Sequence, residues 1–494
     1  MQDRTSHRLS EKAIIGNVLF AFGVALTLAL NGCFLAKVYE LPAHPDESKA
    51  VFTPLPNQGT LVGLAVSGGG SRAATFAAGA LEALAEVRIM REGKELSVLE
   101  TVTHMSSVSG GSLATAYYAM KKPDKSEAVL AAGQGLTPTY QQFFASFKAD
   151  MQKDFWALAR ARQLQKFRAF NPTKLAYSFA DVWDDDFFRE VTFSKLYDRE
   201  AAGHSPRIIL NGTIYNTGRR LAMTTLPPSD FAYDITNVIH DKLAAVKTKF
   251  TKEGLASFDK SIEQARNQFL PQTFEDIQCD HSGLPVSLAV AASASFPPVI
   301  GPVTYQAEGT KIFIHVGDGG LFDNLGTESL ATLFLKKLNS THPVVRKGLI
   351  LVIDASYPFD AGGADLDTRE KGFKVFVDDP SRIVGIMEER ANAYQAMLWH
   401  SLRAVDTSPL PDFDHLKLII LRYTDAEWND GDPIPTECDK STYNTAEKIK
   451  KTVRQVPTQF KIEDPCHAAL LIESAYKVVA RQRQRIVDFL QKSP

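Results

Sequence analysis

Apolar runs of strand length alternate with longer Ala- and Leu-rich stretches over the first part of the chain. Residues 60–66, TLVGLAV, predict a buried strand, and residues 73–87 have the composition of a helix. The same plan repeats in residues 100–108, ETVTHMSSV, and residues 113–120, LATAYYAM. In both units a glycine-rich turn joins the strand to the helix.

Two later segments extend this pattern. Residues 207–223 predict a hairpin that turns near Asn216, Thr217 and Gly218, and residues 348–356 predict another buried strand. Strands that alternate with helices predict an α/β fold, with a mostly parallel sheet and helices on both of its faces.

Two long inserts, residues 121–205 and 228–282, interrupt the pattern and are expected to be largely helical and charged. In the first insert, aromatic residues between 143 and 170 alternate with lysines and arginines, a mixture that suits a membrane interface. The alternative is a helical cap whose aromatic residues pack on the core and whose cations are solvated. We favour the cap.

The N-terminus differs from the rest of the chain. Residues 13–36 carry no charge and follow a short basic stretch, so they predict an export signal or a membrane-spanning anchor. The segment contains LNGC, residues 30–33, which resembles the lipobox of bacterial lipoproteins, in which the cysteine is acylated after cleavage. We therefore expect a protein of the bacterial cell envelope, attached to the membrane through Cys33 or through an uncleaved anchor.

The remaining composition is that of an ordinary globular protein. The formal net charge is −2, so no overall field favours nucleic acid as a partner. Four cysteines occur, and export into an oxidising compartment permits a disulfide. Cys438 and Cys466 flank one C-terminal segment and form the favoured pair; free thiols are the alternative.

We divide the chain into four parts: 1–36, signal or anchor; 37–58, a Pro-rich tether; 59–425, the α/β domain with its inserts; and 426–494, a helical extension.

The serine-rich turn at residues 106–112 is the first candidate for chemistry. A nucleophile elbow needs a sharp turn between strand and helix, with small residues on both sides of the nucleophile. Ser107-Val108-Ser109-Gly110-Gly111 has this spacing, and in this register Ser109 is the nucleophile. The N-terminus of the following helix would stabilise negative charge beside it. A plain glycine-rich turn is the alternative.

Two further motifs complete the candidate site. Gly68, Gly69 and Gly70 follow a strand and leave bare N–H groups that can hold an anion, either a phosphate or the oxyanion of a tetrahedral intermediate. The spacing of known nucleotide-binding loops is missing. Asp318 stands at the end of a short strand, before two glycines, where a carboxylate can act as a base toward a serine hydroxyl.

Together these motifs resemble the patatin-like phospholipase family over roughly residues 60–355. The resemblance implies that the loop GGGSR, residues 68–72, forms the oxyanion hole, that Ser109 attacks, and that Asp318 completes a Ser–Asp dyad. It also implies an acyl-lipid substrate such as a phospholipid. Arg72 would either brace the loop or contact a lipid phosphate.

Several alternatives stay open. A Ser-His-Asp triad would need a histidine after the acid, and none of the later histidines stands in a clear turn at a strand end; they are His342, His400, His415 and His467. Asp354 is the rival acid. No cysteine or histidine spacing suggests a metal, and we expect no cofactor. An acyltransferase on the same dyad and a non-catalytic lipid-binding lipoprotein are the rival functions.

Overall fold

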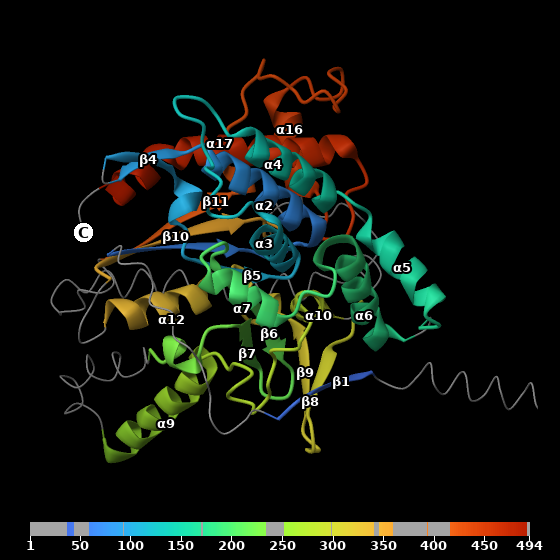
Figure 1. The fold of residues 1–494 in the computed structure, drawn as a ribbon, viewed down its shortest axis with the longest axis vertical. Coiled ribbons are helices and arrows are strands. Elements are labelled where there is room, and N and C mark those ends of the chain that lie inside the picture. The colour runs from blue at the N-terminus through green and yellow to red at the C-terminus, as the bar shows by residue number, and fades with distance from the viewer. Residues whose placement is uncertain are drawn as a thin grey trace, which may run out of the picture.

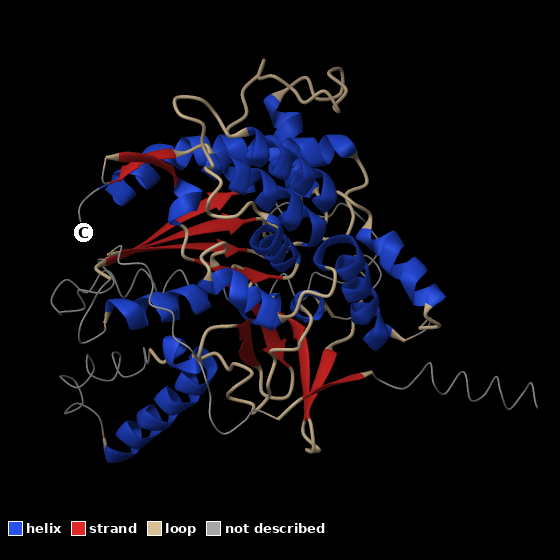
Figure 2. Cartoon of the chain, in the orientation of Figure 1, coloured by secondary structure: helices blue, strands red, loops and turns tan. Residues whose placement is uncertain are grey.

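Nine strands form the central sheet of the computed structural model, and helices lie on both of its faces (Figures 1 and 2). The structure describes residues 37–43, 59–91, 93–168, 171–233, 251–297, 299–339, 345–358, 393 and 415–491. The strands of the sheet are β1 (Val38–Leu41), β2 (Thr60–Val66), β5 (His104–Val108), β6 (Arg207–Ile214), β7 (Arg219–Thr224), β8 (Val303–Ala307), β9 (Phe313–Asp318), β10 (Lys347–Asp354) and β11 (Leu416–Arg422).

The sheet is mixed but mostly parallel, as predicted. Its order is β1-β8-β9-β6-β5-β2-β10-β11, with β7 paired to β6. The run from β6 to β11 is parallel throughout, and so is the pair of β1 and β8. Strands β7 and β9 run antiparallel to β6, and β8 runs antiparallel to β9. The predicted hairpin at residues 207–223 is therefore confirmed. A small separate hairpin joins β3 (Arg88–Arg91) to β4 (Lys94–Ser97).

Alternate residues of each central strand enter two different cores. In β2, Leu64 and Val66 belong to the larger core, whereas Leu61 and Ala65 belong to the smaller one. This period of two is what a strand covered on both faces requires. The larger core lies under α2 (Gly70–Ala85), α3 (Gly110–Lys121) and α17 (Pro465–Gln491); the smaller lies under α12 (Thr327–Leu338).

The first insert is helical, as predicted, and most of its aromatic residues are core residues. Phe143, Phe144, Phe147 and Phe155 are buried, so the cap interpretation is confirmed for them. Phe167 is the exception, with 84% of its surface exposed. Among the described residues, the helices of the two inserts and of the segment that follows are α4 (Pro138–Met151), α5 (Phe155–Gln165), α6 (Pro172–Trp183), a π-helical turn (Asp184–Phe188), α7 (Phe193–Ala201), a 3-10 turn (Pro228–Phe231), α9 (Lys252–Phe269) and α10 (Val286–Ser293).

The expected tether is corrected at its beginning. Residues 38–41 form β1, which pairs with β8 at the edge of the sheet, because their backbone groups extend the β8 ladder despite the Pro-rich sequence that follows. Residues 44–58 and the N-terminal 1–36, including Cys33, lie outside the described residues. Within the described part of the chain, no helix combines the length and apolar character needed to cross a bilayer.

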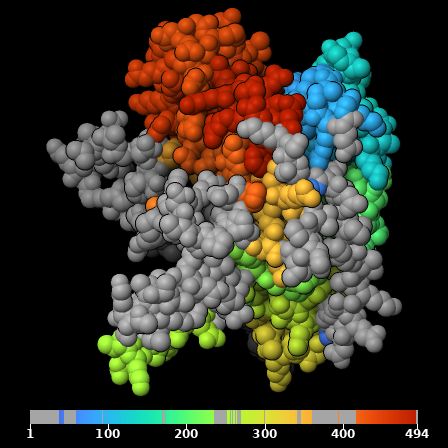
Figure 3. Space-filling model, turned by 90° about the vertical axis from the view of Figure 1, so that its left-hand side faces the viewer, coloured from blue at the N-terminus to red at the C-terminus, as the bar shows by residue number. Residues whose placement is uncertain are grey.

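The C-terminal extension contains α16 (Ala446–Gln455) and α17, and the latter packs along α2. It is coloured orange to red in Figure 3, where it forms one end of the molecule. A disulfide joins Cys438 to Cys466, which confirms the favoured pair. Cys279 is buried and free.

Candidate active site

Two strand ends meet on β6 and bring the predicted nucleophile to the predicted acid. Strand β7 occupies one edge of β6, so β5 and β9 share the other edge, and they run toward each other along it. Val108, the last residue of β5, is paired with Asn211; Asp318, the last residue of β9, is paired with Gly212. Because Asn211 and Gly212 are consecutive, Ser109 and Asp318 emerge side by side.

Ser109 has the backbone of a nucleophile elbow. Its φ of 54° and ψ of −125° lie in a region of backbone conformation that residues other than glycine rarely adopt, which is typical of strained functional turns. The two following glycines are required by close backbone contacts. A Cβ on Gly110 would lie 2.0 Å from the carbonyl oxygen of Gly70, and one on Gly111 would lie 2.4 Å from that of Ser67. The elbow and the glycine loop are therefore packed backbone against backbone.

Asp318 is buried, and burial raises the pKa of its carboxyl to about 6. Two donors oppose this rise in the pKa: the Gly320 N–H and the Ser109 hydroxyl. The Gly320 N–H donates to Oδ1 at 2.8 Å, while Oδ2 has no hydrogen-bond partner of normal geometry among the described residues. The Ser109 hydroxyl thus lowers the pKa of the Asp318 carboxyl although no hydrogen bond of normal geometry joins the two side chains. Catalytic hydrogen bonds are often poorly aligned until substrate binds.

A buried polar network fixes the elbow from behind. The Ser109 N–H donates to Ser293 Oγ at 3.1 Å, and Ser293 Oγ donates to the carbonyl oxygen of Asn211 at 2.5 Å. The Asn211 amide donates to Ser106 Oγ at 2.8 Å and accepts from the Ser329 hydroxyl at 2.6 Å. No motif in the sequence marks Asn211 or Ser329, whereas Ser293 lies in a segment rich in alanine and serine, AASASFPP, residues 291–298.

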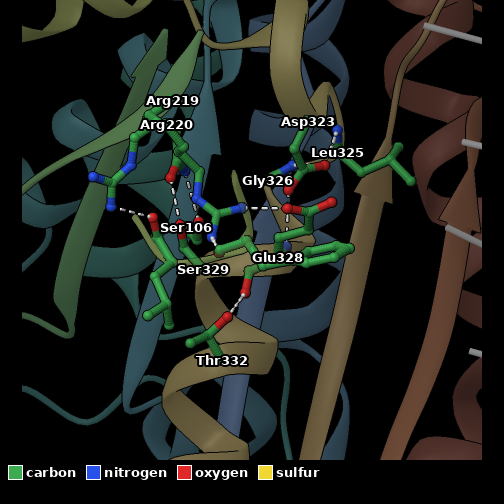
Figure 4. Close-up of polar contacts among 12 residues, drawn as sticks. Ser106, Arg219, Arg220, Asp323, Leu325, Gly326, Glu328, Ser329 and Thr332 are labelled. Atoms are coloured by element: carbon green, nitrogen blue, oxygen red, sulfur yellow. Dashed lines mark hydrogen bonds and ion pairs between the residues drawn. The ribbon is translucent and has the colours of Figure 1, made fainter. Parts of the chain in front are cut away.

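The chain after Asp318 is held by a second buried carboxylate. Asp323 accepts the N–H groups of Leu325, Gly326 and Glu328 at 2.8 to 3.1 Å. Figure 4 shows these contacts together with the buried Arg220, which pairs with Glu328 at 2.5 Å. Asp323 is therefore occupied by the backbone, which leaves Asp318 as the carboxylate of this segment that approaches the serine.

Of the three glycine N–H groups expected to face an oxyanion, one already has an acceptor within the protein. Gly68 donates its N–H to the carbonyl oxygen of Asn324 at 2.9 Å, so this expected donor is already engaged. The N–H groups of Gly69 and Gly70 stand at the beginning of α2 and find no acceptor among the described residues. Both residues have positive φ, 139° and 60°, which favours glycine. A Cβ on Gly68 would lie 3.4 Å from the Cβ of Ser109, so the loop lies beside the elbow.

Arg72 braces the loop. Its side chain is buried and donates from Nε to the carbonyl oxygen of Ala355 at 2.9 Å and from Nη1 to that of Val456 at 2.7 Å. The guanidinium also lies over the rings of Tyr357 and Tyr423. Of the two roles left open by the sequence, these contacts support bracing.

The rival residues are engaged elsewhere. Asp354 is buried and accepts from Arg422 Nε at 2.7 Å and from the Ser356 N–H at 2.9 Å. His467 lies in the C-terminal extension, 3.7 Å from Asp464. His342 and His400 lie outside the described residues. Within the described part of the chain, no group of three or more His, Cys, Asp or Glu side chains is arranged to hold a metal ion.

An α/β sheet that presents a serine elbow, a glycine loop and a buried aspartate at neighbouring strand ends defines a class of ester hydrolase. The family model described as Patatin-like phospholipase matches residues 64–331, which is more than half of the chain. The chain belongs to the patatin-like phospholipase family, a family of lipid hydrolases.

Solved structures show distant likeness. Human GIVD cytosolic phospholipase A2 has 11% identity and a TM-score of 0.42, covering 90% of this chain and 61% of the human one. The same enzyme with methyl gamma-linolenyl fluorophosphonate has 12% identity and a TM-score of 0.40, covering 89% and 60%. VipD from Legionella pneumophila has 11% identity and a TM-score of 0.30, covering 92% and 71%. The chain thus spans about three fifths of the human protein's length. No curated protein sequence matches it.

Proposed function

We propose that the chain is a membrane-tethered serine lipid acyl hydrolase, of the phospholipase A or lysophospholipase type, that acts through Ser109 and Asp318. The observation that carries this proposal is the meeting of β5 and β9 on one edge of β6, which places the serine elbow beside a buried carboxylate. The pKa of about 6 keeps Asp318 ionised at neutral pH and therefore able to accept a proton.

The reaction proceeds in two halves. Asp318 accepts the hydroxyl proton of Ser109 while Oγ attacks the ester carbonyl carbon, and the N–H groups of Gly69 and Gly70 donate to the oxyanion. The intermediate collapses, the alcohol leaves with the proton from Asp318, and an acyl-enzyme remains. Asp318 then takes a proton from water, the resulting hydroxide attacks the acyl carbon, and the fatty acid leaves as Ser109 regains its proton.

Membrane attachment through the N-terminal segment is part of the proposal. Residues 13–36 carry no charge, and LNGC supports lipidation of Cys33, with a spanning anchor as the alternative. Attachment would keep the enzyme next to its bilayer substrate and raise the effective substrate concentration without any new contact. The intact mass of the detergent-extracted protein distinguishes the two: a chain that begins at a modified Cys33 supports lipidation, and one that begins at Met1 contradicts it.

A substrate panel tests the activity. Purified protein is incubated with phospholipids, lysophospholipids and neutral esters, and released fatty acid is measured, with Ser109→Ala as the control. Labelling by a fluorophosphonate probe separates an enzyme from a lipid-binding protein that kept the fold. Adding an alcohol acceptor reveals whether acyl transfer competes with hydrolysis. Absence of both fatty acid release and labelling would overturn the proposal.

A further inference from the structure

The C-terminal extension reaches the glycine loop, although it lies outside the family-matched residues 64–331. The contact is made by residues 456–460, VPTQF, between α16 and α17, which we term the brace segment. Its Gln459 carbonyl oxygen accepts the N–H of Ser71 at 2.7 Å, and its Val456 carbonyl oxygen accepts from Arg72 at 2.7 Å.

The brace segment also fits against Gly70. A Cβ on Gly70 would lie 2.2 Å from the carbonyl oxygen of Gln459 and 2.8 Å from its carbonyl carbon, so the two backbones are in direct contact. Ser71 carries the next N–H after those of Gly69 and Gly70. Its donation to the brace segment fixes the first turn of α2 and so sets the direction of the two preceding donors.

Two anchors hold the brace segment. The Cys438–Cys466 disulfide closes the loop that contains α16 and the brace segment. Within that loop, the centroid of the Phe460 ring lies 4.8 Å from that of Phe179 and 5.8 Å from that of Trp183. The Phe460 carbonyl oxygen also accepts the N–H of Trp156 at 3.2 Å.

We propose that the brace segment is a positioning element for the oxyanion donors, and that turnover depends on the Cys438–Cys466 disulfide. Oxyanion stabilisation depends on donor placement at the scale of tenths of an ångström. Opening the disulfide frees the loop that holds Gln459 and Val456, so the N–H groups of Gly69 and Gly70 lose their fixed direction. This inference rests on the proposed hydrolase function.

The test compares oxidised and reduced enzyme in the Cys279→Ser background, which removes the free buried thiol. A dithiol reagent reduces the Cys438–Cys466 disulfide to two cysteine thiols by transferring two electrons and two protons. The reagent itself is oxidised to a cyclic disulfide. With a short soluble ester we expect kcat to fall about tenfold or more, KM to change less than twofold, and fluorophosphonate labelling to slow in parallel. Reoxidation should restore all three.

Two variants distinguish positioning from loss of stability. Phe460→Ala keeps the disulfide but removes the other anchor, so kcat should again fall with KM nearly unchanged. Lys477→Met removes the ion pair with Asp432 at 2.8 Å, in the same extension but away from the loop. It should lower the unfolding temperature and leave kcat unchanged.

The outcomes separate the two proposals. If the oxidised enzyme neither releases fatty acid nor is labelled, the proposed function fails. If the oxidised enzyme is active, and both the reduced enzyme and Phe460→Ala keep kcat within twofold or change only KM, the positioning role is overturned. Should reduction unfold the protein, as seen by circular dichroism, the Phe460→Ala result decides alone.

Discussion

The proposed catalytic pair, Ser109 and Asp318, and the glycine loop are held in place by different kinds of contact. Ser109 follows β5 and Asp318 ends β9, and both strands end at neighbouring residues of β6, so one strand sets the separation of the two residues. The glycine loop has no such single support. It is held by carbonyl groups from separate parts of the chain: Asn324, Ala355, Val456 and Gln459.

The pair and the loop are therefore sensitive to different substitutions. The pair depends on backbone pairing inside the sheet, which most single substitutions leave intact. The loop depends on carbonyl groups from three remote segments, one of which, the brace segment, belongs to the C-terminal extension. Changes far from the site should therefore affect oxyanion stabilisation more readily than proton transfer.

The largest effect is expected at the nucleophile. Ser109→Ala should lower kcat on the order of 10⁴-fold or more, because no other group can form the acyl-enzyme. Esterase rate and fluorophosphonate labelling measure it. Ser112→Ala is the matched control, because it removes a hydroxyl of the same turn that contacts Ser293 at 2.8 Å, and its effect on kcat should not exceed the tenfold loss expected for the supporting network. The reverse result would place the nucleophile in another register.

Asp318→Asn should reduce kcat about 10³-fold, because an amide cannot accept the proton of Ser109. In the wild type, kcat/KM should rise with pH up to the pKa of Asp318 at about 6 and then level off. Asp354→Asn, which loses the partner of Arg422, should remain active. An inactive Asp354→Asn beside an active Asp318→Asn would transfer the role of base to Asp354.

Asp318→Asn should stabilise the fold at neutral and higher pH, although it lowers kcat. The folded-state pKa of Asp318 lies above its unfolded value, so its contribution to folding is largest at low pH and is lost as pH rises from about 4 to 6. Above that range the buried charge opposes folding by up to about 3 kcal/mol. Asp318→Asn should therefore raise the melting temperature at pH 8 and change it little at pH 4.

A smaller loss is expected from the glycine loop. In Gly69→Ala, the new Cβ would lie 2.9 Å from the carbonyl oxygen of Ala355 and 2.9 Å from Arg72 Nη2, at a φ of 139°. The loop must shift, and loss of one oxyanion donor lowers kcat about 100-fold, with KM little changed. Steady-state kinetics measure both constants. A rise in KM alone would assign the loop to substrate binding instead.

The smallest effect is expected behind the elbow. Asn211→Ala removes hydrogen bonds to Ser106, Ser107 and Ser329 but leaves the pairing of β6 unchanged. We expect kcat to fall about tenfold through slight misplacement of Ser109. The unfolding free energy should also fall, by about 2 kcal/mol, because buried polar partners are left unpaired. Denaturant titration and kinetics measure the two effects; a loss as large as that of Ser109→Ala would mean that Asn211 takes part directly.

The sequence predicted what is local. The strand, turn and helix around Ser109 follow from apolar runs and small residues, and the strand before Asp318 is equally local. The network of Asn211, Ser293 and Ser329 could not be predicted, because it joins β6, α10 and α12, which are far apart in the sequence. Gly68 was expected to donate its N–H to the oxyanion, whereas this N–H donates to the carbonyl oxygen of Asn324. The sequence could not indicate this, because Asn324 is remote from Gly68 along the chain.

The edge strand β1 would limit how far the enzyme could move from the attachment point proposed above. Val38 is already paired with Thr304, so with attachment at Cys33 only five peptide units separate the anchor from the folded sheet. They reach at most about 18 Å. A flexible tether over all of residues 37–58 would have allowed the domain to move much farther from the anchor. With the proposed attachment at Cys33, a link this short would confine the enzyme to lipids of its own leaflet, which would reach the site by lateral diffusion.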